Sequence, residues 1–193
     1  MKIFAVAPAG GSSSRFGSEN KLLYKLNGKP ILQYVIDSLI MSKISATVIV
    51  SGCYKHVIEG ISENKRILFT HNSNWQKGMG SSISEGVKYL LKKFDTRNSA
   101  IILLNADMPY ISAEIIDMII DSHLENKKLI TVPLFKGIYG HPVIFDSSYI
   151  DKLLLLKGEI GGKNILKENI DKINFINIDN EAIIKDIDYK NFS

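Results

Sequence analysis

The sequence predicts an α/β fold in which a mostly parallel central sheet lies between two layers of helices. Short apolar, β-branched runs alternate with segments of helical periodicity along the whole chain. The runs have the length of buried strands, and a loop of small residues follows the first of them directly. In sheets of this kind, ligands bind outside the carboxyl ends of the strands.

Seven apolar runs are expected to form the strands, at residues 3–7, 46–51, 66–70, 99–104, 128–134, 142–146 and 173–178. Three helices are expected between them. Pro30 begins one whose inward face holds Ile31, Tyr34, Val35, Leu39 and Ile40. Residues 82–91 repeat this spacing, and Ser112 can cap a helix whose isoleucines at 115, 116, 119 and 120 face inward. No internal repeat, low-complexity tract or linker divides the sequence, so residues 1–193 are expected to form one domain.

The composition is that of an ordinary globular protein, with 45% hydrophobic and 23% charged residues. The net charge of +4 is spread along the chain without a basic block, which favours small anionic ligands over nucleic acid. The single cysteine, Cys53, excludes an intrachain disulfide and a cysteine-based metal site, and we expect a buried thiol at a strand end. No apolar run is long enough to cross a bilayer, so a cytoplasmic protein is expected.

The loop after the first predicted strand is a candidate phosphate site. Its small residues let the backbone approach an anion, and two cations can neutralise a polyphosphate. The candidate residues are Ala9, Gly10, Gly11, Ser13, Arg15 and Lys21. The glycine spacing fits neither a Walker A loop nor the dinucleotide fingerprint. The alternative is a flexible Gly/Ser turn with two solvated cations.

Asp107 is the strongest candidate for a catalytic residue. It follows residues 101–106, a run too apolar for a surface strand, and Met108-Pro109 then turns the chain. A carboxylate at the end of a buried strand is costly unless it meets a cation or hydrogen-bond donors. Because Mg²⁺ prefers carboxylate oxygens and substrate phosphates, Asp107 is expected to be one of its ligands. The alternative is an N-cap for the helix that begins near Ser112.

Gly78, Gly80, Ser81 and Ser82 form a second candidate anion site, at the head of a predicted helix. The alternative is a serine N-cap after a glycine turn. Trp75 lies beside this loop, where its ring could stack on a ligand or cover the pocket. His141 enters a strand after a glycine-rich turn, and a lone histidine there is more often structural.

These segments together resemble the molybdopterin nucleotidyltransferases, and most closely the molybdenum cofactor cytidylyltransferases. The resemblance is carried by residues 9–17, 20–23, 74–82, 104–109, 140–143 and 186–189, which occur in the family's order and span nearly the whole chain. It implies a Rossmann-like nucleotidyltransferase fold. The segment 157–163 also matches, with Glu159 and Lys163 where the family has Asp and Arg.

The resemblance implies roles for individual residues. Arg15 and Lys21 would lie on the phosphates of an NTP, and Asp107 with Asp188 would hold Mg²⁺. Asp186 would support Asp188, although Tyr189 replaces the family's Thr and leaves open which of the two acids is the ligand. The remaining substrate contacts would come from Ala9, Gly10, Gly11, Ser13, Gly78, Gly80, Ser81, Ser82 and His141.

The implied reaction is transfer of CMP from CTP to the terminal phosphate of molybdopterin, with release of pyrophosphate. The motif Ala9-Gly10-Gly11 leans towards guanylyl transfer and GTP. Three other motifs, at residues 20–23, 78–82 and 140–143, lean towards cytidylyl transfer, so CTP is expected. The alternatives are a guanylyltransferase, another sugar-phosphate or alcohol-phosphate nucleotidyltransferase, or a noncatalytic protein that delivers the cofactor. The expected partners are molybdopterin, an NTP and a recipient molybdoenzyme, with neither nucleic acid nor membrane.

Overall fold

The computed structural model describes residues 1–13, 16, 20–159 and 161–187. Within these residues the main sheet consists of β1 (Lys2–Ala9), β4 (Ala46–Ser51), β5 (Ile67–His71), β6 (Ser99–Leu103), β7 (Ile130–Phe135), β8 (Ile138–Tyr139), β9 (Val143–Asp146) and β10 (Ile173–Asn177). Their order is β10-β7-β9-β6-β1-β4-β5, and β8 pairs with β7. A separate antiparallel hairpin is formed by β2 (Lys25–Leu26) and β3 (Lys29–Pro30).

The sheet is mostly parallel, as the sequence predicts. β1 pairs in parallel with β4 and β6, β4 with β5, and β7 with β10. β9 runs antiparallel between β6 and β7, and β8 is antiparallel to β7. Each of the seven predicted runs is a strand, with ends that differ by at most two residues. Every residue of β4 and β6 is buried, because helices cover both faces of the sheet and favour continuous apolar runs.

The strand order reverses beside β1. The chain passes from β1 through α1 (Ile31–Met41) to β4 and β5 on one side, then returns through α3 (Met79–Lys93) to β6 on the other side. The chain is thus added on one side of β1 by the first crossover and on the other side by the second, so the order reverses between β1 and β6. In open α/β sheets, such a reversal is where a ligand crevice forms.

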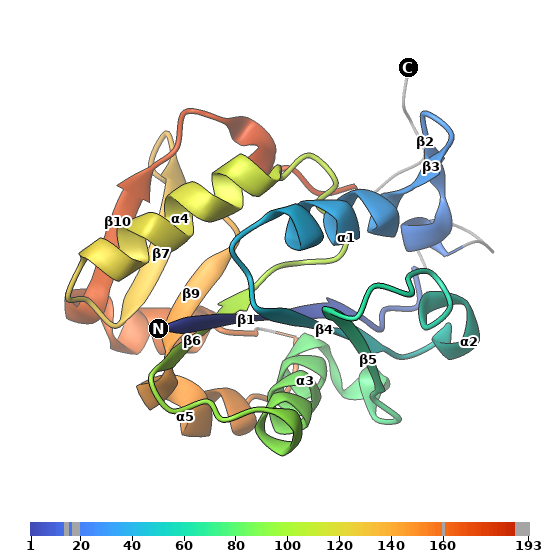
Figure 1. The fold of residues 1–193 in the computed structure, drawn as a ribbon, viewed down its shortest axis with the longest axis horizontal. Coiled ribbons are helices and arrows are strands. Elements are labelled where there is room, and N and C mark those ends of the chain that lie inside the picture. Colours follow the sequence, from blue (N-terminus) through green and yellow to red (C-terminus); the bar gives the residue numbers. More distant parts are fainter. Residues whose placement is uncertain (14–15, 17–19, 160, 188–193) are drawn as a thin grey trace.

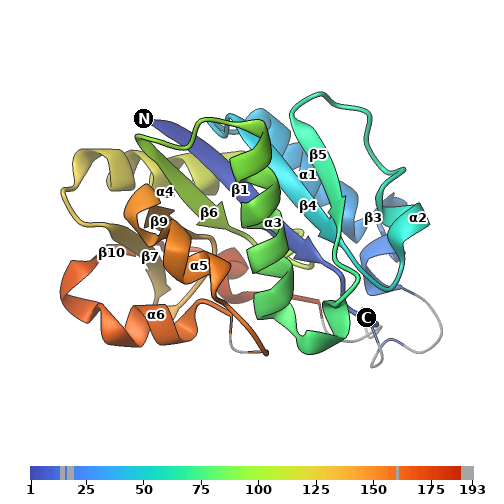
Figure 2. The same cartoon turned by 90° about the horizontal axis from the view of Figure 1, so that it is seen from below.

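Figure 1 shows helices on both faces of the sheet, with α1 and α4 (Ala113–Glu125) on one face and α3 and α5 (Ile150–Leu154) on the other. The view from below in Figure 2 agrees, with α3 and α5 in front of the strands. The predicted three-layer arrangement is therefore confirmed. No helix within the described ranges is long and apolar enough to span a membrane.

The predicted helices are present, with small differences at their ends. Ser112 caps α4, since its hydroxyl accepts a hydrogen bond from the Ile115 amide at 3.4 Å. α3 begins at Met79, earlier than the predicted start at residue 82. The short helices α2 (Lys55–Ile58) and α6 (Lys163–Glu168), like α5, were not predicted from the sequence. They are too short for an apolar periodicity to be visible.

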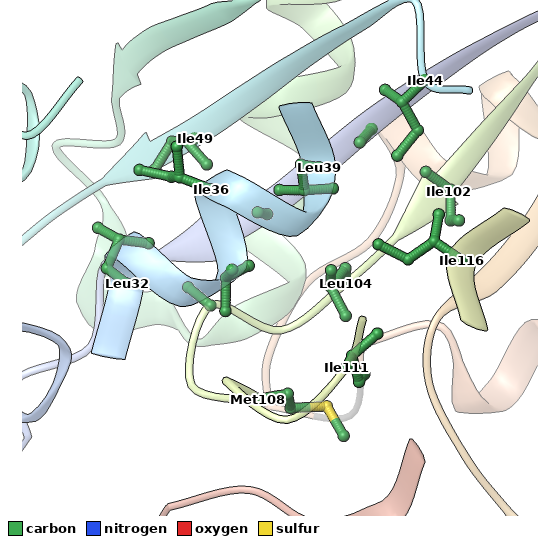
Figure 3. Close-up of a cluster of buried hydrophobic side chains, with 14 of the residues drawn as sticks. Leu32, Ile36, Leu39, Ile44, Ile49, Ile102, Leu104, Met108, Ile111 and Ile116 are labelled. Carbon is green, nitrogen blue, oxygen red and sulfur yellow. The ribbon is translucent and has the colours of Figure 1, made fainter. Parts of the chain in front are cut away.

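The core beneath α1 and α4 also holds the loop that leaves β6. Figure 3 shows Leu104, Met108 and Ile111 of this loop among the buried side chains of α1 and α4. All three are at most 2% exposed. The loop is therefore held in the hydrophobic core on both sides of Asp107, which fixes where that carboxylate emerges.

The expectation of a buried thiol is wrong, because Cys53 is exposed. Cys53 lies two residues beyond the end of β4, and its amide donates a hydrogen bond to the Gly10 carbonyl at 3.2 Å. The backbone there has already left the sheet, so the side chain points away from the core.

We expect Ile116→Ala to destabilise the protein by about 2–5 kcal/mol, because Ile116 is fully buried and its truncation leaves a cavity. Met118→Ala on the same helix is the matched control, since Met118 is 51% exposed and its loss should change stability by no more than about 0.5 kcal/mol. Urea unfolding of both variants measures the difference. Equal losses would contradict the assignment of the inward face of α4.

Candidate active site

A cavity of about 730 Å³ opens where the strand order reverses. The loops after β1, β5 and β6 meet there, because the carboxyl ends of these parallel strands lie at the same edge of the sheet. Its lining comes from residues 8–13, 16, 21–22, 75–76, 78–79, 82, 105, 107, 159 and 186. The charged residues among them are Lys21, Asp107, Glu159 and Asp186.

The first loop lies against the end of β4. A Cβ atom on Gly52 would be 2.5 Å from the Gly10 carbonyl oxygen and 2.7 Å from Cβ of Trp75. Gly52 therefore lets the first loop and the segment after β5 approach each other. At Gly11, by contrast, a Cβ atom would meet nothing within 4 Å, so this residue faces open space.

Three hydrogen bonds hold the backbone around Lys21. The Ser13 hydroxyl donates to Asn20 Oδ1 at 3.3 Å and accepts from the Lys21 amide at 3.1 Å. The same oxygen of Asn20 accepts from the Leu22 amide at 2.9 Å, which caps the 3₁₀ helix Lys21–Leu23. Asn20 is buried and, within the described chain, its Nδ2 has no hydrogen-bond partner. Ser13 and Asn20 thus hold the first loop and Lys21 in one unit.

The Lys21 ammonium contacts Asp107 across the cavity. Lys21 Nζ lies 2.7 Å from Asp107 Oδ2, and both side chains are about one-fifth exposed. The second oxygen, Oδ1, is buried and has no hydrogen-bond partner among the described residues. Ser112 is the N-cap of α4, so the alternative of Asp107 as that cap is wrong. Instead Asp107 points into the cavity with one oxygen still unmatched.

The C-terminal segment brings a second carboxylate to the same place. The Ile187 amide donates to the Asp107 carbonyl at 3.1 Å, and Asp186 lines the cavity. Residues 185–187 are not part of a strand. Asp188, the predicted metal ligand, lies outside the described residues, as does Arg15.

The second candidate anion site, at residues 78–82, forms hydrogen bonds with neighbouring backbone. The Gly80 amide donates to the Gly158 carbonyl at 2.8 Å, and the Ser81 hydroxyl donates to the Gly78 carbonyl at 2.8 Å. A Cβ atom on Gly78 or Gly80 would lie within 3 Å of the backbone of residues 157–159. Gly78 and Ser82 line the cavity, whereas Gly80 and Ser81 do not. The glycines here serve close packing against another segment.

Asn72 holds the head of α3 from within. It is 4% exposed, and its Nδ2 donates to the hydroxyls of Ser81 at 2.8 Å and Ser82 at 3.1 Å. Its Oδ1 accepts from the Asn74 amide at 2.9 Å. Both serines are therefore oriented by a buried amide that directly follows β5.

His141 lies near the site but does not line the cavity. Its amide donates to the Ile183 carbonyl at 2.7 Å. Burial lowers the pKa of His141, while a hydrogen bond with the Leu103 backbone and the charge of Asp107 act in the opposite direction. The imidazole is therefore neutral near pH 7, and its Nδ1 has no hydrogen-bond partner in the described part of the chain.

The structure brings most of the predicted site residues together in one cavity. Those that line it are Ala9, Gly10, Gly11, Ser13, Lys21, Gly78, Ser82 and Asp107. The sequence analysis missed Gly52, Asn20 and Asn72 as positioning residues. Gly52 and Asn72 directly follow β4 and β5, so their position after a buried strand, the same signal that identified Asp107, could have found them.

Comparisons with known proteins identify a family for this chain. Residues 5–173 match the family described as "MobA-like NTP transferase domain". A Pyrococcus horikoshii protein named "Probable molybdenum cofactor guanylyltransferase" is 30% identical over 144 residues, which cover 74% of this chain and 68% of that protein. A Thermococcus sibiricus protein of the same name is 30% identical over 143 residues, covering 73% of this chain and 66% of that protein.

Solved structures share the fold. The crystal structure of Rv0371c from Mycobacterium tuberculosis has a TM-score of 0.82 at 18% identity, covering 98% of this chain and 94% of that one. A structure of that protein in complex with manganese has a TM-score of 0.73 at 16% identity, covering 93% and 90%. At these identities the likeness concerns the fold, and it supports the α/β assignment.

Gly52→Ala should separate the first loop from Trp75, because the new methyl group would overlap the Gly10 backbone. We expect a loss of stability of about 1–3 kcal/mol, typical of overpacking, and weaker NTP binding. Thermal unfolding and quenching of the single tryptophan, Trp75, by added NTP measure the two effects. Gly60→Ala is the control, since a Cβ atom there would meet only the His56 carbonyl, at 3.7 Å. Indistinguishable behaviour of the two variants would contradict this role of Gly52.

Proposed function

The chain belongs to the MobA-like NTP transferase family, and we propose that it transfers a nucleotidyl group from GTP to the terminal phosphate of the molybdenum cofactor. Pyrophosphate is the second product. The observation that carries the proposal is the pairing of Lys21 with Asp107 at the point where the strand order reverses. A cation for phosphates and a carboxylate for a metal ion are the two groups that such a transfer requires.

The residues present fit a divalent cation. Asp107 Oδ1 is buried and lacks a partner in the described chain, and Asp186 lines the same cavity. No group of three or more potential ligands occurs among the described residues. This agrees with Mg²⁺, which takes one or two carboxylates and completes its coordination with water and substrate phosphates. When bound, Mg²⁺ would neutralise charge on the phosphates during transfer.

The protein's own part in the reaction is to position the substrates and to neutralise charge. The first loop would hold the NTP with its backbone amides at Gly10 and Gly11, and Lys21 would offer its charge to the phosphates. The acceptor phosphate is ionised at neutral pH, so it needs no general base. Its oxygen forms a bond to the α-phosphorus, while the bond to pyrophosphate breaks and pyrophosphate leaves with the electron pair.

The preference for GTP rests mainly on the named relatives, together with the first loop. The motif Ala9-Gly10-Gly11, which leans towards guanylyl transfer, lines the cavity, and both named relatives are probable guanylyltransferases. Several residues that lean towards CTP have packing or capping roles instead. Asn20 caps a 3₁₀ helix, and a Cβ atom on Gly80 or Gly140 would overlap neighbouring backbone.

CTP is the second candidate nucleotide. The sequence analysis favoured it on the greater number of matching motifs. Lys21 and Leu22 from one of those motifs line the cavity, as do Gly78, Met79 and Ser82 from another. The acceptor and the recipient molybdoenzyme are part of the proposal in either case, as is the expectation of a single domain.

With molybdopterin as acceptor, we expect GTP to support pyrophosphate release at least about tenfold more efficiently than CTP, a difference of about 1.4 kcal/mol in transition-state binding. Assays with each NTP, with and without molybdopterin, make the comparison. Equal or better turnover with CTP would reject the guanylyl proposal and leave the transfer chemistry intact. NTP binding without pyrophosphate release from any NTP would instead favour a noncatalytic delivery protein.

Asp107→Asn should fold normally but lose at least about a hundredfold in pyrophosphate release, because it removes charge from the reacting phosphates and the metal. Asp186→Asn and Asp188→Asn are measured in parallel. The variant that loses more pyrophosphate release identifies the second metal ligand. Asp151→Asn is the control, since Asp151 is exposed on α5. Wild-type turnover by well-folded Asp107→Asn would reject the metal assignment.

A further inference from the structure

The ion pair between Lys21 and Asp107 differs from the other ion pairs within the described ranges. Its side chains are 19% and 20% exposed, whereas every other such pair has both partners at least 33% exposed. The partners are 86 residues apart in the sequence, and both line the cavity. Exposed pairs contribute little because water screens them, but a pair this shielded constrains both groups.

Asp107 is only half matched by Lys21. The ammonium satisfies Oδ2, whereas Oδ1 is buried without a hydrogen-bond partner among the residues described. A buried carboxylate oxygen without a donor or cation is costly. The carboxylate is therefore built to receive a further positive charge, and Lys21 supplies only part of it.

We propose that Lys21 serves as a placeholder cation, whose ammonium neutralises Asp107 before the substrates bind and leaves it when metal and nucleotide bind. The inference rests on the proposed function, because it concerns the same metal and phosphate site. Lys21 would exchange the carboxylate for the NTP phosphates, and Asp107 would then be available to a divalent cation. Metal and nucleotide would in consequence bind together rather than separately.

The physical reason is repulsion between like charges at one carboxylate. A divalent ion on Asp107 would share it with an ammonium that lies 2.7 Å from Oδ2, so Lys21 weakens metal binding until it moves away. Phosphates attract the ammonium and remove this penalty. By linkage, the same coupling strengthens nucleotide binding when metal is present.

The surrounding hydrogen bonds allow this exchange without rearrangement of the loop. The backbone of Lys21 is held by Ser13, and the adjacent Asn20 caps the helix that begins at Lys21. Only the long side chain of Lys21 has to change its rotamer, a motion that is fast on the timescale of turnover. The first loop can remain in place while the charge moves.

The test measures Mn²⁺ binding in the absence of nucleotide and acceptor. The electron paramagnetic resonance signal of the free ion reports how much Mn²⁺ remains unbound. We expect Lys21→Met to bind Mn²⁺ at least about tenfold more tightly than the wild type, within the usual range of coupling between sites. The double variant Lys21→Met, Asp107→Asn should lose this gain. Lys25→Met is the matched control, because Lys25 is an exposed lysine on the nearby strand β2. The Mn²⁺ affinity of this variant should equal that of the wild type.

Two results would overturn the proposal: no gain in Lys21→Met, or an equal gain in Lys25→Met, which would indicate a general charge effect. Lys21→Gln repeats the measurement if the Met variant does not fold. If neither variant folds without metal, thermal unfolding with added Mn²⁺ replaces the titration: stabilisation of the single variant that the Asp107→Asn double variant lacks agrees with the proposal, and its absence contradicts it. Pyrophosphate assays on the wild type decide the proposed function separately, since the Mn²⁺ titration uses no substrate.

Discussion

The arrangement of the site depends on one carboxylate held at the boundary of the hydrophobic core. Asp107 lies between the buried residues Ala106 and Met108, in a loop whose side chains pack beneath α1 and α4 (Figure 3). The backbone cannot move outward without exposing that core. The Asp107 carboxylate therefore needs a cation or hydrogen-bond donors at its present position. Lys21 meets it from the first loop, and the Ile187 amide brings the C-terminal segment to the same point.

Much of the fold could be predicted because its signals are local. Continuous β-branched runs such as those of β4 and β6 predict strands buried on both faces, and Ser112 predicts the start of α4. The short helices α2, α5 and α6 could not be predicted, because four to six residues carry no clear period. The antiparallel direction of β9 is likewise set by a connection rather than by its own residues.

The site could be predicted as far as it follows from the ends of strands. Asp107 and the first loop share a cavity because parallel strands place their carboxyl ends together. The role of Gly80 could not be predicted in this way, because its amide donates a hydrogen bond to the carbonyl of Gly158, which lies far along the chain. The glycine pattern that favours an anion site also suits a close approach of two backbones, and only the contact distinguishes them.

The glycines in and around the cavity differ in how much change they tolerate. Gly52, Gly78 and Gly80 leave no space for a side chain, because neighbouring backbone lies within 3 Å of the position of a Cβ atom. Gly11 lines the same cavity and has open space around it. Mutagenesis libraries intended to alter nucleotide preference should therefore concentrate diversity at the first loop around Gly11 and keep the other three positions constant. The cavity can be reshaped at Gly11 while the close backbone contacts at the other three glycines are retained.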